Sequence, residues 1–178
     1  TDILVIDPTD DSQSLIPWPY DHVNPPCITP GGIMYAVGGD DALENNIIKI
    51  DTNTNIITLV TPPSPLPITN SGIGHCIYSK TEYVYIILNS IDIIYKLNPI
   101  DDTITTITSS FSMINGSNVM TLVENSNGII YGFQLHLALK IDTSDDSIVD
   151  ISFPVGDYFI TGGFILEDII YFLSHDFT

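Results

Sequence analysis

The sequence predicts an all-β chain folded as a β-propeller of four-stranded antiparallel blades. Short apolar runs rich in Ile, Val, Thr and Tyr are bounded by Gly, Pro, Asn and Asp, which is the pattern of strands and tight turns. These runs recur with a period of about 40–50 residues, a spacing typical of propeller blades. No stretch of the chain shows the sustained period of an amphipathic helix.

The clearest repeat is a polar turn between two apolar runs, which we assign to the third and fourth strands of a blade. The apolar residue before each copy of the turn is Ile6, Ile50, Leu97 or Ile141. The second strand precedes this unit as Ile33-Met34-Tyr35, Tyr83-Val84-Tyr85, Ile129-Ile130-Tyr131 and Ile169-Ile170-Tyr171. The innermost strands are predicted by position at 27–29, 75–78, 119–123 and 159–161.

We expect a single domain over residues 1–178. Its blades are predicted at approximately 26–60, 74–108, 118–153 and 158–178, the last being completed by residues 1–16. Residues 158–178 hold only two strands, and residues 1–16 hold the matching third and fourth. Pairing these two segments would close a four-bladed ring and remove two open sheet edges. The alternative is that the chain is a section of a larger propeller.

The first unit resembles a known repeat. Its second strand ends in Gly38-Gly39, and Pro65-Leu66-Pro67 is followed by Gly74-His75 at the entry of the next unit. These features resemble the Kelch repeat. The Trp expected in the last Kelch strand is Ile57, Thr105 or Val149 in this chain. The resemblance implies a propeller fold and carries no function, because propellers serve both as binding scaffolds and as enzymes.

Charge excludes several partners. The chain has 22 acidic residues, four lysines, no arginine and a formal net charge of −18. Recognition of phosphate relies on basic side chains, so we expect no nucleic-acid partner and no anionic membrane partner. No apolar run reaches the ~20 residues that cross a bilayer, so no membrane insertion is expected. The acidity favours an extracellular or particle-surface setting.

The predicted binding residues are Trp18, Tyr20 and His22. They lie on a Pro-rich loop that connects the closing blade to the first full blade, on the face that collects the longer loops. Aromatic side chains on a stiff loop can anchor a protein partner or stack on a sugar. The structural alternative is that Trp18 packs over the closing blade.

The other candidate groups have structural interpretations. The acidic turns lack the ligand spacing of a calcium loop, so we interpret their side chains as turn caps. Lys49, Lys96 and Lys140 share one repeat position; they could bind an anion, but we expect their ammonium groups to balance turn acids. His75 on an innermost strand could face the channel, and we interpret it as structural.

Two cysteines, Cys27 and Cys76, fall at matching places of neighbouring blades. We therefore expect them on adjacent innermost strands as small buried side chains. A disulfide would require those strands to come close enough.

The sequence predicts no catalytic residue, cofactor or metal. No nucleophile elbow, phosphate loop or zinc-protease motif is present. We interpret the chain as a non-enzymatic binding or structural module that presents loops to a protein partner. The alternatives are a carbohydrate-binding propeller (a lectin) that uses Trp18 and Tyr20 and, less favoured, a polysaccharide-acting enzyme with carboxylates in its channel.

Overall fold

The computed structural model describes residues 2–6, 9–10, 12–17, 24–37, 46–63, 74–88, 93–108, 121–134, 137–152 and 158–176. These residues form sixteen β-strands joined by turns and short connections. In this part of the chain no helix has the length and apolar character that crossing a bilayer requires. The all-β prediction is therefore confirmed.

Three four-stranded antiparallel sheets form the body of the molecule, and each follows the chain order from its innermost to its outermost strand. Blade 1 consists of β3 (Cys27–Ile28), β4 (Ile33–Val37), β5 (Ile47–Asp51) and β6 (Ile56–Val60). Blade 2 consists of β7 (Gly74–Tyr78), β8 (Val84–Leu88), β9 (Ile93–Leu97) and β10 (Ile104–Thr108). Blade 3 consists of β11 (Thr121–Glu124), β12 (Ile129–Gln134), β13 (Leu137–Asp142) and β14 (Ser147–Ser152).

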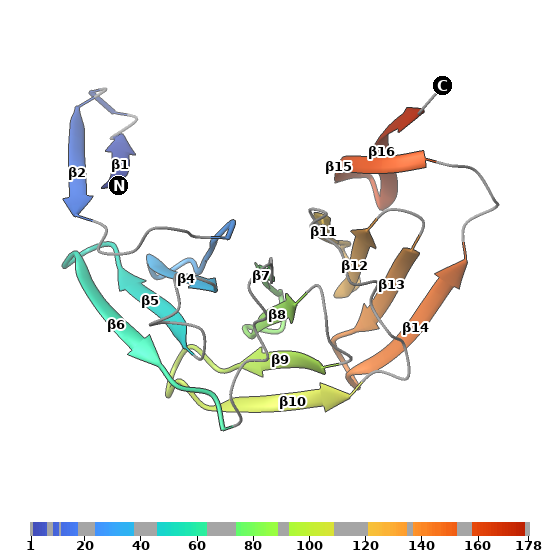
Figure 1. Cartoon of the computed structure of the whole chain (residues 1–178), viewed down its shortest axis with the longest axis horizontal. Coiled ribbons are helices and arrows are strands. Elements are labelled where there is room, and N and C mark those ends of the chain that lie inside the picture. The colour runs from blue at the N-terminus through green and yellow to red at the C-terminus, as the bar shows by residue number, and fades with distance from the viewer. Residues whose placement is uncertain are drawn as a thin grey trace.

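Two hairpins flank these blades. The N-terminal hairpin pairs β1 (Asp2–Ile6) with β2 (Gln13–Pro17), and the C-terminal hairpin pairs β15 (Tyr158–Leu166) with β16 (Ile169–Asp176). The sheets stand around an arc with β7 and β11 inside and β6, β10 and β14 outside, and the two hairpins lie at its opposite ends (Figure 1). The pairing of both hairpins into one blade, which we expected to close a four-bladed ring, is not seen. Each hairpin is a separate two-stranded sheet.

The predicted strands are confirmed where they fall on described residues, with one clear difference in length; positions 119 and 120 of the predicted strand at 119–123 lie outside the described residues. β15 was expected at 159–161 but continues to Leu166, with a register shift between Ile160 and Gly162. The tight turn between β15 and β16 lies at Glu167 and Asp168, which adopt positive φ angles of 50° and 61°. The register shift lies next to the Gly162-Gly163 pair, and glycine inside a strand often marks such an irregularity.

The core consists of layers between neighbouring blades. Successive side chains of a strand point to opposite faces. In blade 1, Tyr35 and Val37 pack towards blade 2, whereas Ala36 belongs to the layer that contains Ile3 of the N-terminal hairpin. All five residues of β8 are buried because blade 2 is covered on both sides. The unbroken apolar sequence of β8 thus reflects a strand between two layers.

Gly74 packs tightly between a side chain of blade 1 and one of its own blade. A Cβ atom at this position would lie 2.5 Å from a methyl of Val37 and 2.6 Å from a methyl of Leu88. Glycine is therefore required here for packing, and this packing positions the inner end of blade 2.

Candidate functional site

The predicted binding residues Trp18, Tyr20 and His22 lie outside the described residues. The structure does describe both ends of their loop. Pro17 closes β2, and the loop re-enters blade 1 at Asn24, whose backbone N–H and side-chain amide donate to the carbonyl of Val37 at 3.2 and 2.9 Å. The loop therefore connects the outermost strand of the N-terminal hairpin to the inner end of blade 1.

His75 is buried on β7. Burial lowers its pKa to about 4, so the imidazole is neutral at physiological pH. This agrees with the structural interpretation of His75, because a general base works best with a pKa near the operating pH. His136 lies outside the described residues, and His175 lies within β16.

Cys27 and Cys76 lie on the innermost strands of blades 1 and 2, as predicted. Both thiols are free and partly buried rather than fully buried, because the inner edge of each blade is only partly covered. The Cys76 thiol donates to the carbonyl of Tyr35 at 3.2 Å. A hydrogen bond with Cys76, together with burial, raises the pKa of Cys27, which keeps that thiol protonated and a poor nucleophile.

A polar contact links blade 1 to blade 2. The ammonium of Lys49 lies 2.6 and 2.8 Å from the carboxylate oxygens of Asp102, and the Tyr35 hydroxyl donates to the same carboxylate at 3.1 Å. Lys49 and Tyr35 are paired across β4 and β5, whereas Asp102 ends the outer turn of blade 2. We call this set an inter-blade clamp.

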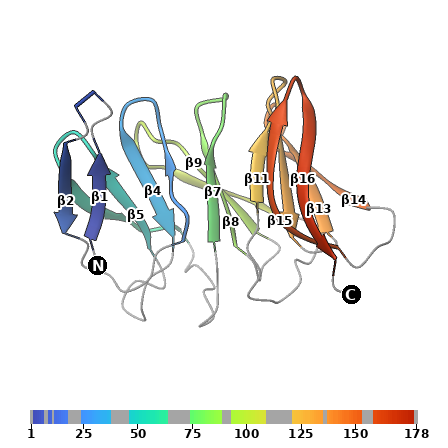
Figure 2. The same ribbon diagram turned by 90° about the horizontal axis from the view of Figure 1, so that it is seen from above.

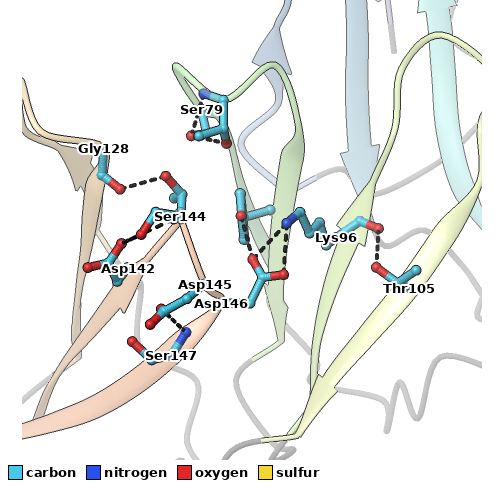
Figure 3. A network of polar contacts seen from close by, with 12 residues as sticks. Ser79, Lys96, Thr105, Gly128, Asp142, Ser144, Asp145, Asp146 and Ser147 are labelled. Atoms are coloured by element: carbon cyan, nitrogen blue, oxygen red, sulfur yellow. Dashed lines mark hydrogen bonds and ion pairs between the residues drawn. The ribbon is translucent and has the colours of Figure 1, made fainter.

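A second inter-blade clamp links blade 2 to blade 3 in the same way (Figure 3). Lys96 lies 2.7 and 2.8 Å from the carboxylate oxygens of Asp146, and the Tyr85 hydroxyl donates to Asp146 at 2.8 Å. The Lys96 ammonium also lies 4.5 Å from the ring centroid of Tyr83, within the range of a cation–π contact. Burial, followed by the contact with Asp146, raises the pKa of the Tyr85 phenol.

Asp102 and Asp146 both adopt left-handed backbone conformations, with φ of 57° and 60°. Asp and Asn tolerate this region better than most residues.

The clamps confirm the prediction that Lys49 and Lys96 balance turn acids. Sequence reasoning missed the two tyrosines, although Tyr35, Tyr85, Tyr131 and Tyr171 share one repeat position and gave a signal.

A second set of carboxylates joins the turns that follow the innermost strands. The Ser79 hydroxyl donates to Glu124 at 2.6 Å, and the backbone N–H of Lys80 donates to the same carboxylate at 3.0 Å. Ser126 repeats this contact with Asp168 through its hydroxyl at 2.6 Å and its N–H at 2.8 Å. A hydroxyl and an N–H of one blade thus hold a carboxylate of the next.

Most other turn acids cap their own turns, as predicted. Asp10 accepts from the N–H of Ser12, Asp101 from Thr103 and Asp145 from Ser147, each at 2.9 or 3.0 Å. Side-chain and backbone hydrogen bonds from these partners lower the pKa of each carboxyl group. Within the described ranges, no three His, Cys, Asp or Glu side chains gather in a way that could hold a metal ion.

The tight turns within blades gather on one face of the molecule, which we call the turn face (Figure 2). Inside a blade, the two turns of this face are joined directly: Thr52 donates through its N–H and hydroxyl to Gly32, and Thr143 does so to Gly128. The turn face is therefore a framework of hydrogen bonds within and between blades. It supports the opposite face, to which the sequence assigns the longer loops.

Radially ordered four-stranded blades that pack face to face define a β-propeller. No protein-family model matches the sequence, and no curated protein matches it. Solved structures do share its fold. Virginiamycin B lyase from Staphylococcus aureus superposes with a TM-score of 0.72 at 17% identity, over 97% of this chain and 56% of the lyase chain. A catalytically inactive variant of that lyase with quinupristin gives 0.73 at 12% identity, over the same shares.

The extracellular domain of BT4673 from B. thetaiotaomicron gives a TM-score of 0.65 at 15% identity, over 96% of this chain and 23% of that chain. The chain thus spans about half the length of the lyase structures. Identities this low show the fold alone. The superpositions confirm the β-propeller prediction. The Kelch resemblance stays a prediction from the sequence.

Proposed function

We propose that this chain is a binding module of the β-propeller class that presents loops to a protein partner and catalyses no reaction. One observation carries the proposal, namely the use of the ionisable side chains. In the described residues, most carboxylates of the turn face cap turns or join blades, and Lys49 and Lys96 are held by Asp102 and Asp146. Groups committed to such structural contacts are poorly placed to carry protons for a reaction.

The side chains of His75 and Cys27 support the same proposal, because neither is suited to act as a base or a nucleophile. A His75 side chain with a pKa of about 4 is a weak base, and a Cys27 thiol with a raised pKa carries little thiolate. Both groups support the inner strands instead. This supports a scaffold whose function lies in its loops.

Charge indicates the kind of partner. The chain carries 22 acids against four lysines, and two of those lysines are neutralised by the inter-blade clamps. The excess negative potential favours association with a protein surface rich in Lys or Arg, and it speeds the encounter at low salt. We therefore propose a basic protein surface as the partner, with Trp18 as the aromatic anchor and Tyr20 and His22 beside it.

The chain contains a single tryptophan, so its fluorescence reports on Trp18 alone. A lysine-rich peptide is titrated into the protein at low salt, and binding is measured by Trp emission and by calorimetry. We expect a change in emission, weaker binding as salt rises, and roughly tenfold or greater loss of affinity in Trp18→Ala. Ile100→Ala is the matched control, because Ile100 is an exposed apolar residue of the turn face. Equal affinity of the Trp18→Ala and Ile100→Ala variants would overturn the proposal.

A glycan array tests the lectin alternative. Aromatic residues on a Pro-rich loop, Trp18 and Tyr20, favour this alternative because they can stack on sugar rings. Glycan binding that Trp18→Ala abolishes would replace the protein partner with a carbohydrate. Turnover of a polysaccharide that is lost when one Asp or Glu near the axis is replaced would overturn the non-enzymatic proposal.

A further inference from the structure

We propose that Cys27 and Cys76 are a covalent modification site, at which a small-molecule disulfide oxidises the two thiols to a reversible disulfide between blades 1 and 2. The two residues are far apart in the sequence and lie on the innermost strands β3 and β7. The proposal goes beyond the binding function, because it is independent of the partner that the loops bind.

The two cysteines face each other because they are offset by one position in the strand register. Cys27 pairs with Tyr35 across β3 and β4. In blade 2 the equivalent tyrosine is Tyr85, and it pairs with Ile77. Cys76 precedes Ile77, and successive side chains of a strand point to opposite faces. Cys27 therefore faces blade 2 and Cys76 faces blade 1, and both side chains pack against the same apolar layer between these blades.

Hydrogen bonds place the two thiols side by side. The Cys76 thiol donates to the carbonyl of Tyr35, the strand partner of Cys27, at 3.2 Å. It also lies 3.7 Å from the carbonyl oxygen of Pro25, which shortly precedes Cys27. A hydrogen bond joins the two thiols themselves. Two thiols in such contact need only small changes of side-chain torsion to reach the geometry of a disulfide.

The junction between blades 2 and 3 has no cysteine at the corresponding positions. Ile77 occupies the register position of Cys27, and Leu122 occupies that of Cys76. Both side chains pack in the apolar layer between blades 2 and 3. Two aliphatic side chains therefore suffice for packing at this place in a blade. The thiol pair at the first junction adds a chemical reactivity that packing does not require.

Thiol–disulfide exchange supplies the oxidation in two steps. Both thiols are free and partly exposed, so oxidised glutathione can reach them. The Cys76 thiolate attacks one glutathione sulfur, a bond forms between the two, and the other glutathione leaves with the proton that Cys76 lost. The Cys27 sulfur then attacks Cys76, and the second glutathione leaves with the proton of Cys27. Two protein thiols become one disulfide, and oxidised glutathione is reduced to two thiols.

The order of the two steps follows from the environment of Cys27. The hydrogen bond with Cys76, burial and the charge of a Cys76 thiolate raise the pKa of Cys27, so Cys76 attacks first. In the mixed disulfide the Cys76 sulfur carries no charge and is a weaker acceptor, and burial remains as the main cause of the raised pKa. The first step therefore makes the second step easier, which favours the disulfide between the two cysteines over a lasting mixed disulfide.

The disulfide would hold the first junction at a second place. The inter-blade clamp of Lys49 and Asp102 joins the blades at an outer turn, whereas the cysteines lie on innermost strands. A cross-link between residues far apart in the sequence restricts the unfolded chain, so oxidation should lower the equilibrium constant for unfolding by roughly a hundredfold. By linkage, folding should favour the disulfide over the two thiols by the same factor.

A redox titration tests the proposal. The 178-residue chain is equilibrated with graded mixtures of oxidised and reduced glutathione, with and without urea, and acid-quenched samples are mapped by mass spectrometry. We expect a disulfide between Cys27 and Cys76 within one chain, with an equilibrium constant for its formation that is roughly a hundredfold larger in the folded chain. Urea unfolding of the oxidised and reduced proteins should give the same factor, and dithiothreitol should reverse the change.

Two variants serve as controls. Cys27→Ser should form only a mixed disulfide at Cys76. The double variant Cys27→Ile/Cys76→Leu copies the aliphatic pair of the next junction, so it should fold and unfold alike in every glutathione mixture. No disulfide in the wild-type chain, mixed disulfides only, or cross-links between chains would overturn the proposal. Equal formation of the disulfide in the folded and unfolded chain would also overturn it, because the fold would then not bring the thiols together.

Discussion

Lys96 and Asp146 belong to different blades, and the Lys96 ammonium lies 2.7 Å from the nearer Asp146 carboxylate oxygen. Their side chains are 15% and 32% exposed, so the pair is only partly screened by water. The Tyr85 hydroxyl adds a third group to the contact. This arrangement links the middle of one sheet to the outer turn of the next, and it supplies a direct test of how the blades are held together.

A double-mutant cycle measures the strength of this inter-blade clamp. Lys96→Met keeps the apolar stem, and Asp146→Asn keeps the left-handed turn residue. We expect each single variant to lower the free energy of unfolding by about 1 kcal/mol, with a coupling energy of about 0.5–1 kcal/mol for a partly exposed pair. Urea unfolding at low salt gives these values. Strictly additive effects of the two substitutions would contradict the clamp.

The backbone conformation of Asp102 leads to a second prediction. Its φ of 57° is costly for most residues, by roughly 1 kcal/mol for Ala relative to Asn or Gly. Asp102→Ala should therefore destabilise the protein more than Asp102→Asn, which keeps the local conformation and loses the ion pair with Lys49. Asp102→Gly should fall near Asn. Thermal unfolding of the three variants checks the order, and equal losses would show that the backbone is not strained.

The close approach at Gly74 makes it intolerant of a side chain. Gly74→Ala would place a methyl against Val37 and Leu88, so we expect a loss of about 1–3 kcal/mol in the free energy of unfolding. Gly31→Ala is the matched control, because the nearest atom to its added Cβ is the Thr29 hydroxyl at 3.8 Å. Denaturant unfolding compares the two variants. A similar loss in both would contradict the packing argument.

His75 gives the pH dependence of stability a defined window. Its pKa falls from 6.5 to about 4 on folding because the side chain is buried. Between these two values the unfolded chain binds a proton that the folded chain does not, so stability is full above pH 6.5 and falls as the pH drops towards 4. The loss is about 3 kcal/mol at most.

His75→Gln should flatten this part of the curve of unfolding free energy against pH. Hydrogen bonds also lower the pKa values of the turn carboxylates Asp10, Asp101 and Asp145. The stability that these carboxylates contribute is lost only at more acidic pH. Chemical unfolding at several pH values from 7 to 4 separates the two effects. An unchanged slope in the variant would show that His75 titrates normally in the fold.

The sequence by itself determined the strands, their order within a blade and the capping of the turns. These features depend on residues close in the sequence. Short apolar runs define β4, β8 and β12, and an Asp accepts from a residue two positions later, as Asp101 does from Thr103. The sequence also placed the lysines at one repeat position. It assigned Trp18, Tyr20 and His22 to a binding loop, and that assignment stays a prediction.

The tertiary structure decided which side chains meet across blades. Lys49 and Asp102 are 53 residues apart, and Lys96 and Asp146 are 50 apart, so no local pattern could pair them. Their contacts depend on how far each blade is rotated and shifted relative to the next. The packing of core layers, such as the one that contains Tyr35 and Val84, sets this arrangement. The same packing sets the curvature of the arc. For this reason repeats recognised in the sequence could not reveal that the two terminal hairpins lie apart.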